Sequence, residues 1–407
     1  MACARPGVKS AARPAVRFHV REAAADAMEE TMTANPTLKM ICMSDSRQCN
    51  AGCTYCPSRG MGVKERLPLP DLRRVVGYFV AHTNRAAIKP RELSFVVNTL
   101  GEPTLGIENV LGVADYVAHV NNSGGCAVPV YFFMSSTNLM DVPQGVVQFA
   151  NRLGYLTVSL HGRPAAEYVE RLARFGEGVT TEGSEVILKR PVNLYARYRD
   201  IMAHFDLAAM YPVKEPDMTM EDSALWVEEF SECFRTLVAL SDAELADFLS
   251  RLSFNDTILN ELLLLAIGAN LTYKCAAGIE TLQVTPDMEF YPCMFTQYPD
   301  LRMGDIESGI DPTWLQRFEP RRHAGAEPEC AGCELASVCG GCCLDWAHKD
   351  PLGNGYFSPT ECAYRRGLVK AVKSFLENLK GRPFAMEALQ KQFNLCNQEW
   401  KPKSKGE

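Results

Sequence analysis

Short apolar runs alternate with longer amphipathic stretches through the first half of the chain. Several runs have the length and composition of buried strands: 38–42, 93–97, 128–134, 155–160, 207–211 and a shorter candidate at 186–188. The stretches between them repeat apolar residues at helical spacing: 72–82, 107–120, 144–153, 165–175 and 194–204. This alternation predicts βα units, a parallel sheet and an α/β fold. About six such units favour a partial (β/α)6 barrel.

The pattern changes twice in the second half. A helical stretch with few turn signals comes first, and a segment rich in cysteine and turn residues follows it. The second segment predicts a small C-terminal domain that bound metal would have to organise. We therefore expect a flexible N-terminal arm, a core, a helical connector, a cysteine-rich domain and a helical and disordered tail: 1–35, 36–217, 218–270, 271–370 and 371–407.

Composition narrows the classes of function. The chain has 407 residues, with 42 Lys and Arg against 49 Asp and Glu, a formal net charge of −7. A net negative chain lacks the electrostatic footprint of a protein that binds nucleic acid or an anionic membrane. The longest apolar run, at 262–267, falls far short of the roughly 20 residues of a membrane span. With no signal-peptide pattern at the start, we expect a cytoplasmic protein without a membrane or nucleic-acid partner.

Sixteen cysteines point to metal or redox chemistry in a reducing compartment. Cys49, Cys53 and Cys56 have C-x3-C-x2-C spacing, between a predicted strand and a predicted helix. Three thiolates in one loop can hold three corners of a cubane iron–sulfur cluster and leave one iron open. A zinc site would need a fourth ligand, and the nearest downstream histidine is His82. Three unrelated buried cysteines are the other interpretation.

This loop, with Tyr55 directly before its third cysteine, resembles the signature of the radical S-adenosylmethionine (SAM) superfamily. Further segments in the same order extend the resemblance over about residues 38–215. They are Gly101-Glu102-Pro103, with Leu100 at the usual first glycine; Ser135-Ser136-Thr137-Asn138; and Val158-Ser159-Leu160-His161-Gly162, with His161 at the usual aspartate.

The resemblance implies one 4Fe–4S cluster on the three cysteines, with SAM chelating the open iron. Glu102 and the Gly101 backbone would accept hydrogen bonds from the SAM amino group, and glycine there permits a close backbone approach. Arg171 would pair with the SAM carboxylate. The other implied contacts to SAM come from an aromatic ring and short polar side chains: Tyr55, Ser136, Asn138 and Ser159.

Each of these residues also has a plainer interpretation. Glu102 could be a solvated loop acid, Ser159 a strand-end cap and Arg171 a charge on a helix surface. His161 is the one candidate acid or base, because it follows a predicted strand on the side of the expected site. A histidine with a purely structural role is the alternative.

A second set of cysteines lies toward the C-terminus: Cys275, Cys293, Cys330, Cys333, Cys339, Cys343 and Cys362. A C-x2-C pair followed by two further cysteines indicates metal, with a zinc ribbon as the alternative. Together with the segment 284–293, the set resembles the SPASM domain, which carries two auxiliary iron–sulfur clusters. The resemblance assigns Cys275, Cys293 and Cys343 to the first and the other four to the second.

The first auxiliary cluster then lacks a fourth cysteine. Some SPASM proteins have another cysteine shortly after the first, but Ala276, Ala277 and Gly278 follow Cys275 here. Either this cluster is open to substrate or another residue closes it. Cys342 is next to Cys343, and we expect its side chain to point away from that cluster.

The resemblance implies that SAM is cleaved reductively to a 5′-deoxyadenosyl radical, which abstracts hydrogen from a substrate carbon. Because most SPASM proteins act on ribosomal peptides or proteins, we expect an oxidoreductase that modifies a peptide. Met294 argues against the sulfatase-maturing branch, which usually has aspartate there. The alternatives are a small-molecule dehydrogenase or epimerase, acting on a sugar, a porphyrin or a cofactor precursor, and a non-enzymatic iron–sulfur electron-transfer protein.

The expected partners are a reductase, such as flavodoxin or ferredoxin, and a peptide or small-molecule substrate. Only 48 residues precede Cys49, fewer than a leader-binding domain of about 80–90 residues. A leader peptide would therefore be read by a separate leader-binding protein, by residues 218–268 or not at all.

Overall fold

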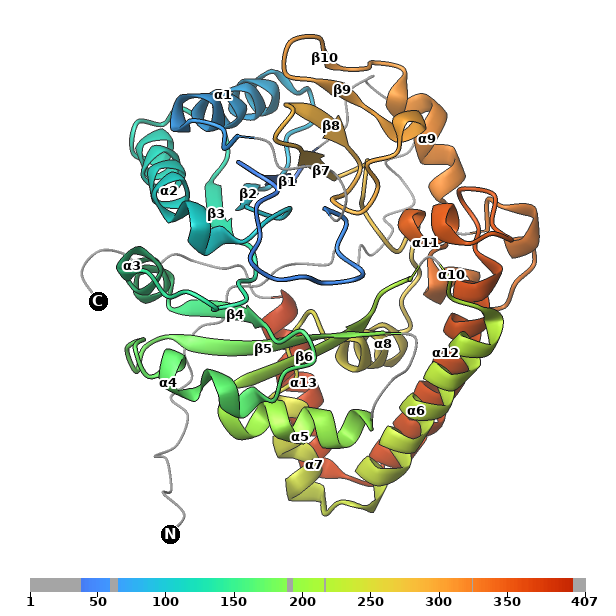
Figure 1. The fold of residues 1–407 in the computed structure, drawn as a ribbon. Coiled ribbons are helices and arrows are strands. Elements are labelled where there is room, and N and C mark those ends of the chain that lie inside the picture. Colours follow the sequence, from blue (N-terminus) through green and yellow to red (C-terminus); the bar gives the residue numbers. More distant parts are fainter. Residues whose placement is uncertain (1–37, 59–64, 189–192, 216, 324, 398–407) are drawn as a thin grey trace.

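The computed structural model describes residues 38–397, except 59–64, 189–192, 216 and 324. The predicted N-terminal arm and the end of the predicted tail therefore lie outside the described residues. Strands and helices alternate in the first half (Figure 1). The strands are β1 (Met40–Met43), β2 (Leu93–Val97), β3 (Val130–Met134), β4 (Tyr155–Ser159), β5 (Thr180–Ile187) and β6 (Leu207–Pro212). The helices are α1 (Leu69–Arg85), α2 (Ile107–Asn122), α3 (Gln144–Leu153), α4 (Val169–Leu172) and α5 (Leu194–His204), with short 3-10 turns η1 (Pro103–Gly106) and η2 (Ala165–Tyr168).

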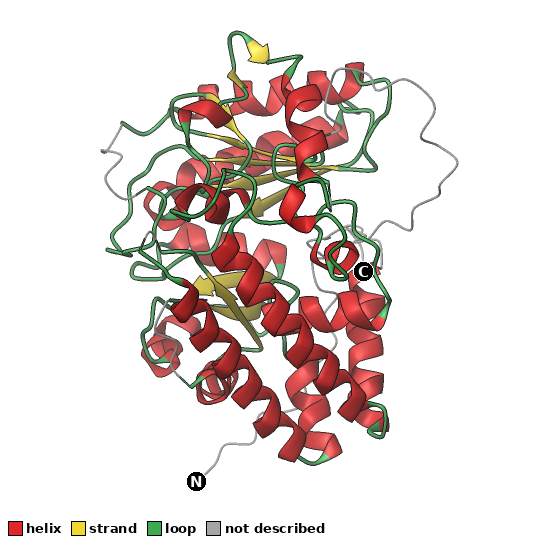
Figure 2. Ribbon diagram, turned by 90° about the vertical axis from the view of Figure 1, so that its right-hand side faces the viewer, coloured by secondary structure: helices red, strands yellow, loops and turns green. Residues whose placement is uncertain are grey.

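The second half is mainly helical, with short strands near its middle. Its helices are α6 (Met220–Ala239), α7 (Asp242–Ser250), α8 (Thr257–Ala266), α9 (Trp314–Arg322), α10 (Ala336–Cys339), α11 (Leu344–Lys349), α12 (Pro359–Leu379) and α13 (Pro383–Asn397), with 3-10 turns η3 (Pro299–Leu301) and η4 (Pro328–Cys330). Its strands are β7 (Thr281–Val284), β8 (Glu289–Tyr291), β9 (Gly304–Asp305) and β10 (Gly309–Ile310). The long helices α6 and α12 lie side by side, as Figures 1 and 2 show. No helix among the described residues is long and apolar enough to cross a membrane.

The strands form two sheets, in the orders β10-β9-β8-β7-β1-β2-β3 and β4-β5-β6. The pairs β1–β2, β2–β3, β4–β5 and β5–β6 are all parallel. A parallel bridge between Thr137 and Val158 connects the segment after β3 to β4, so β1 to β6 follow in chain order. The predicted α/β fold with parallel strands is confirmed. No strand pairing within the described ranges closes the two sheets into a ring.

Several predicted elements match closely, and two do not. The strand at 93–97 and the helices at 144–153 and 194–204 have the predicted bounds. The helix predicted at 165–175 is only a 3-10 turn and one turn of α-helix. The strand predicted at 186–188 is β5, which begins earlier, because polar residues such as Glu182 are buried in it and hide its apolar pattern.

The strand β7 connects the two halves of the chain. It pairs in parallel with β1, although more than 200 residues separate the two strands in sequence. The antiparallel strands β8, β9 and β10 extend the same sheet from β7. The cysteine-rich segment is therefore joined by hydrogen bonds to the sheet that carries the N-terminal cysteine loop.

Burial alternates along β1 and sets its two faces. Ile41 and Met43 are fully buried in the hydrophobic core, whereas Met40 and Cys42 keep part of their surface accessible. Because successive side chains in a strand point to opposite faces, Met40 and Cys42 share the face away from this core. In Figure 1 the chain that follows β1 runs between the two sheets, and this segment contains Cys49, Cys53 and Cys56.

Candidate functional site

The loop after β1 is held by a buried carboxylate. Asp45 is 1% exposed and accepts hydrogen bonds from the Arg66 guanidinium, at 2.6 and 2.7 Å, and from the Asn109 amide, at 2.8 Å. Its own backbone N–H donates to Asn98 Oδ1 at 3.1 Å. Asn98 has φ of +60°, a left-handed conformation that asparagine tolerates better than most residues. These contacts fix where the cysteine loop leaves the sheet.

Glu102 lies at the end of the turn after β2, and its side chain is 3% exposed. Its Oε1 accepts hydrogen bonds from the Thr137 hydroxyl at 2.5 Å and the Thr104 N–H at 3.1 Å. Its Oε2 accepts from the Asn138 N–H at 2.8 Å. The side chain is therefore not a solvated loop acid. Because a carboxylate offers about four acceptor positions, one remains for a further donor.

Asn138 continues this network to the cysteine loop. Its amide nitrogen donates to Asn50 Oδ1 at 2.8 Å and lies 3.8 Å from the Cys49 sulfur. Its side-chain oxygen accepts the Met140 N–H at 2.9 Å. Asn138 therefore connects the carboxylate of Glu102 to the loop of Cys49.

Gly101 is packed too closely to carry a side chain. A Cβ atom there would lie 2.9 Å from the carbonyl oxygens of Ser46 and Gln48. The Glu102 N–H donates to the same Gln48 carbonyl at 2.8 Å. Glycine at this position allows the turn after β2 to lie against the start of the cysteine loop.

His161 contacts the cysteine loop directly. Its Nδ1 lies 3.2 Å from the Cys53 sulfur and 2.9 Å from the Tyr55 hydroxyl. Burial lowers the pKa of His161, and the nearby Arg163 charge lowers it further. The backbone of His161 is left-handed, with φ of +53°, which turns the chain sharply after β4. Sequence reasoning placed this residue beside the site, and the structure brings it to Cys53.

The remaining predicted contacts form two groups. The hydroxyls of Ser136 and Ser159 lie 2.9 Å apart, at the ends of neighbouring strands. The Arg171 guanidinium lies over the Tyr168 ring, 5.5 Å from its centroid. The Nη1 of Arg171 is buried and has no hydrogen-bond partner within the described part of the chain. A buried guanidinium nitrogen without a partner fits an anionic ligand such as a carboxylate.

The three N-terminal cysteines are free thiols that share one loop. Burial raises the pKa of Cys49, and the nearby charges of Glu102, Cys53 and Cys56 raise it further. Soft thiolates are the ligands that iron–sulfur clusters need, so the donor set fits such a group. Among the described residues, no three His, Cys, Asp or Glu side chains have the spacing for a single metal ion. Cysteines that bind different irons of one cluster lie further apart than that.

The C-terminal cysteines gather in two groups. Burial raises the pKa of Cys293 well above its ordinary value, and the thiolates of Cys275 and Cys343 contribute. Burial likewise raises the pKa of Cys330, with contributions from Cys362 and Cys333. Such effects indicate that these thiols lie near one another within each group.

Burial and the nearby Glu361 charge raise the pKa of Cys342, and the thiolates of Cys339 and Cys330, which the resemblance assigns to the second group, contribute. Burial raises the pKa of Cys339 to about 12, while the nearby Lys274 ammonium lowers it. Cys342 is 6% exposed, and its sulfur lies 3.9 Å from the Ser358 carbonyl oxygen.

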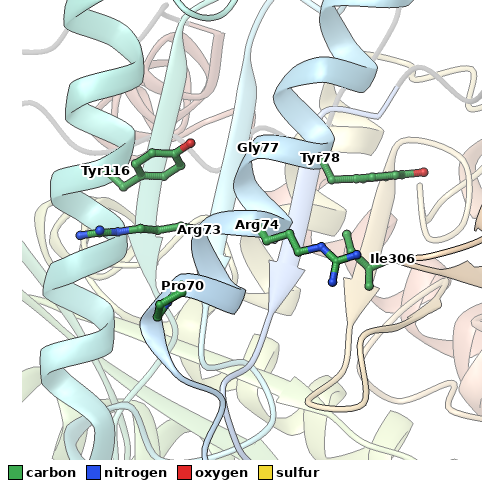
Figure 3. Close-up of a pocket in the computed structure, with 7 residues that line it drawn as sticks. All are labelled: Pro70, Arg73, Arg74, Gly77, Tyr78, Tyr116 and Ile306. Carbon is green, nitrogen blue, oxygen red and sulfur yellow. The ribbon is translucent and has the colours of Figure 1, made fainter.

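A groove of about 700 Å³ lies elsewhere, over α1 and α2. Figure 3 shows Arg73 extending toward Tyr116 and Arg74 toward Ile306. Arg74 forms an ion pair with Glu307 at 2.7 Å. None of the predicted site residues lines this groove, and we assign it no part in the candidate site.

Sequence reasoning missed several residues that build the site. Thr137 lies between two predicted contacts and is completely buried, with its hydroxyl on Glu102. Asp45 and Asn98 hold together the loop after β1, which contains the three cysteines, and the turn after β2, which contains Glu102. An Asn directly after an apolar strand is a turn signal that could have indicated Asn98. Nothing in the sequence distinguishes Asp45 from a surface acid.

No family model matches the chain. Proteins described as probable dual-specificity RNA methyltransferase RlmN, from two strains of Thermus thermophilus, are each 26% identical to it over 126 residues. This match covers 30% of the chain and 33% of each relative, so it spans about a third of the length of these curated proteins.

Solved structures resemble a much larger part of the chain. The anaerobic sulfatase-maturating enzyme anSMEcpe with bound AdoMet matches with a TM-score of 0.63 and 15% identity, covering 89% of this chain and 100% of that one. The same enzyme with AdoMet and the Cp18Cys peptide matches with a TM-score of 0.60 and 16% identity, covering 87% and 99%. Both are structures of a radical SAM enzyme. At this level of identity the similarity concerns the fold: the chain has an α/β fold like that of radical SAM enzymes.

Proposed function

We propose that this chain is a radical SAM enzyme that carries a 4Fe–4S cluster on Cys49, Cys53 and Cys56. The observation that carries the proposal is the network from Glu102 through Asn138 to Cys49. The network joins the cysteine loop to the segments of Glu102 and Asn138, which are remote from it in sequence. Each of these three segments resembles a motif of the radical SAM superfamily. The fold shared with AdoMet-bound enzymes supports the same conclusion.

The cluster and SAM would supply a 5′-deoxyadenosyl radical that abstracts hydrogen from a substrate carbon. The free acceptor position of Glu102 and the Gly101 backbone would hold the SAM amino group. The buried Nη1 of Arg171 would pair with the SAM carboxylate. The hydroxyls of Ser136 and Ser159 would bind the ribose.

Tyr55, Asn138 and His161 would complete the site in different ways. The Tyr55 ring lies beside that of His161, with centroids 6.5 Å apart, and would line the space next to SAM. Asn138 would act mainly by holding the loop of Cys49. His161 would hold Cys53 and Tyr55 in place, because its ring nitrogen already contacts both.

The test is release of 5′-deoxyadenosine from reconstituted protein with SAM and dithionite under anaerobic conditions. The protein should form it, Cys53→Ala should not, and Cys126→Ala should match the unchanged protein, because Cys126 lies between α2 and β3. Glu102→Ala should lose SAM cleavage while its iron content survives. Equal product from the unchanged protein and Cys53→Ala would rule the assignment out.

We propose a peptide or protein side chain as the substrate class. The structure of anSMEcpe with a bound peptide supports this choice, since the present chain shares its fold over most of its length. Met294 remains an argument against sulfatase maturation itself. A dehydrogenase or epimerase of small molecules is the second candidate. Mass spectrometry of candidate peptides and sugars after single turnover separates the two, because only the true substrate is changed.

RNA is a less suitable substrate for this chain. The RlmN relatives are described as RNA methyltransferases, but they match over only 126 residues. The net charge of −7 opposes binding to a phosphate backbone. RNA should therefore neither bind at physiological salt nor stimulate SAM cleavage.

The two C-terminal cysteine groups would hold two auxiliary iron–sulfur clusters, as in a SPASM domain. Such clusters could take an electron from the substrate radical, which would make the net reaction oxidative. A flavodoxin or ferredoxin would supply the first electron, and a separate protein could present a leader peptide. Iron analysis should find about twelve irons per chain, corresponding to three clusters of four.

A further inference from the structure

Cys42 is a cysteine that the proposed chemistry does not use. It lies in β1, seven residues before Cys49. Its neighbours Ile41 and Met43 are fully buried in the core, whereas Cys42 keeps accessible surface on the opposite face. Burial nevertheless raises the pKa of its thiol to about 12. Cys42 therefore lies outside the hydrophobic core, although protein surrounds its thiol.

Strand register brings this face toward Cys293. Cys42 pairs with Gln283 of β7, and Gln283 pairs with Tyr291 of β8. Residues paired across neighbouring strands point to the same face, so these three side chains form one row. Cys293 follows Tyr291 by two residues, the spacing that returns a side chain to the same face.

The electrostatics of the thiols agree with this placement. After burial, the thiolates that raise the pKa of Cys293 are those of Cys275, Cys343 and Cys42. Cys275 also contributes to the raised pKa of Cys343. The thiols of Cys275, Cys343 and Cys42 thus all lie near that of Cys293, and Cys42 alone of the four belongs to β1.

Other side chains near Cys343 are less available. Glu361 Oε2 accepts the Cys343 N–H at 2.7 Å. Asp345 accepts hydrogen bonds from Lys349 at 2.9 Å and Tyr298 at 3.3 Å. By contrast, the Cys42 thiol makes no hydrogen bond within the described part of the chain.

We propose that Cys42 is the fourth ligand of the auxiliary cluster held by Cys275, Cys293 and Cys343. The inference rests on the proposed function, which assigns those three cysteines to a cluster. A 4Fe–4S cluster is ordinarily held by four thiolates, and the sequence offers only three in the expected places. On binding, the thiol releases its proton to solvent and an iron–sulfur bond forms, with no change in oxidation state.

This ligand would close the cluster to substrate and connect it to the strand that leads to the SAM site. The auxiliary cluster could then exchange electrons but could not bind the substrate directly. The same bond would tie β1 to the segment after β8, adding a covalent link to the sheet pairing described above.

The test uses the full chain with the SAM cluster removed by Cys49→Ala, Cys53→Ala and Cys56→Ala together. This parent should hold about eight irons in two auxiliary clusters. Adding Cys42→Ala should lower the iron content by about one per chain. Mild oxidation should then produce the electron paramagnetic resonance (EPR) signal of a three-iron cluster. Cys126→Ala in the same parent is the matched control and should retain every iron without that signal.

Two further variants distinguish the outcomes. Cys42→Ser keeps the size of the side chain and offers an oxygen ligand, so it should keep four irons with a more negative midpoint potential. Unchanged iron, spectrum and potential in both Cys42 variants would overturn the inference and leave the proposed function intact. Loss of iron in Glu361→Gln alone would also overturn it, in favour of the carboxylate. A parent without iron would refute the auxiliary clusters themselves.

Discussion

Glu102→Gln changes one atom at the centre of the hydrogen-bond network. The carboxylate accepts from Thr104 N–H, Thr137 O–H and Asn138 N–H. Glutamine replaces one acceptor oxygen with an NH2 donor. If that donor faces Asn138, two N–H groups oppose each other, and if the amide is reversed, the Thr104 N–H meets the donor instead. One buried backbone N–H is therefore left without an acceptor in either orientation.

The size of the effect follows from this unpaired group. A buried donor without an acceptor costs about 1–3 kcal/mol. If SAM binds only the ordered loop, that penalty corresponds to a rise in the SAM dissociation constant of about 5- to 150-fold. The unpaired N–H would disturb the cysteine loop, because Asn138 also forms a hydrogen bond with Asn50 and approaches Cys49.

The assay is SAM binding by equilibrium dialysis, with iron content measured on the same samples. Glu102→Gln should keep the iron and lose affinity. Glu108→Gln is the matched control, since Glu108 is exposed on α2 and should bind SAM normally. SAM affinity within twofold of the unchanged protein in Glu102→Gln would refute the role given to this network.

Three other changes test separate parts of the account. Gly101→Ala places a Cβ atom 2.9 Å from the Ser46 carbonyl oxygen, so iron analysis should find a partly empty N-terminal cluster, about two irons fewer per chain than before. Arg171→Met removes the unpaired guanidinium and should raise the KM for SAM at least tenfold with little change in kcat, whereas Arg174→Met, on the exposed surface, should not. Burial raises the pKa of Asp256 to about 7, against about 3.9 in an unfolded chain, so the folded state holds this proton more tightly. The bound proton therefore stabilises the folded state fully below about pH 4, and about 4 kcal/mol of this stabilisation is lost as the pH rises through 7. Urea unfolding should show the free energy of unfolding falling over this range, and Asp256→Asn should lack that fall. A free energy of unfolding that rises over the same range would contradict the assignment.

Local pattern predicted the first half of the fold well. The helix at 144–153 and the strand at 93–97 have strong, uninterrupted apolar periodicity, and both have the expected bounds. The start of β5 was missed because Glu182 is buried in it, where it accepts hydrogen bonds from the hydroxyls of Tyr155 and Ser253. A buried carboxylate with partners from distant segments leaves no sign in the local sequence.

Non-local pairing was the larger omission. The strand β7 has only four residues, and its stability depends on β1, which comes more than 200 residues earlier. The pattern within a short stretch of sequence does not indicate a pairing partner so far away in the chain. The same pairing puts Cys42 in the row of Gln283 and Tyr291, so the proposed fourth ligand could not be recognised before the sheet was known.

The candidate site was predicted as a set of residues but not as a network. The motif order predicted Glu102 and Asn138 at one site with the cysteine loop, and the structure brings both to Cys49 through one chain of contacts. The sequence could not tell that Glu102 binds its own chain through Thr137 and Asn138, since both contacts depend on how the ends of β2 and β3 are placed. Arg171 was assigned from the resemblance alone, and only the structure reveals its unpaired Nη1.

The most direct test of the central claim is whether SAM binds the iron that the three N-terminal cysteines leave open. Reduced, reconstituted protein would be mixed with SAM carrying 17O in its carboxylate and 15N in its amine, and examined by electron–nuclear double resonance. The account predicts hyperfine coupling from both labels, and its loss in Cys53→Ala. A reduced cluster on these cysteines with no coupling to either label would contradict it.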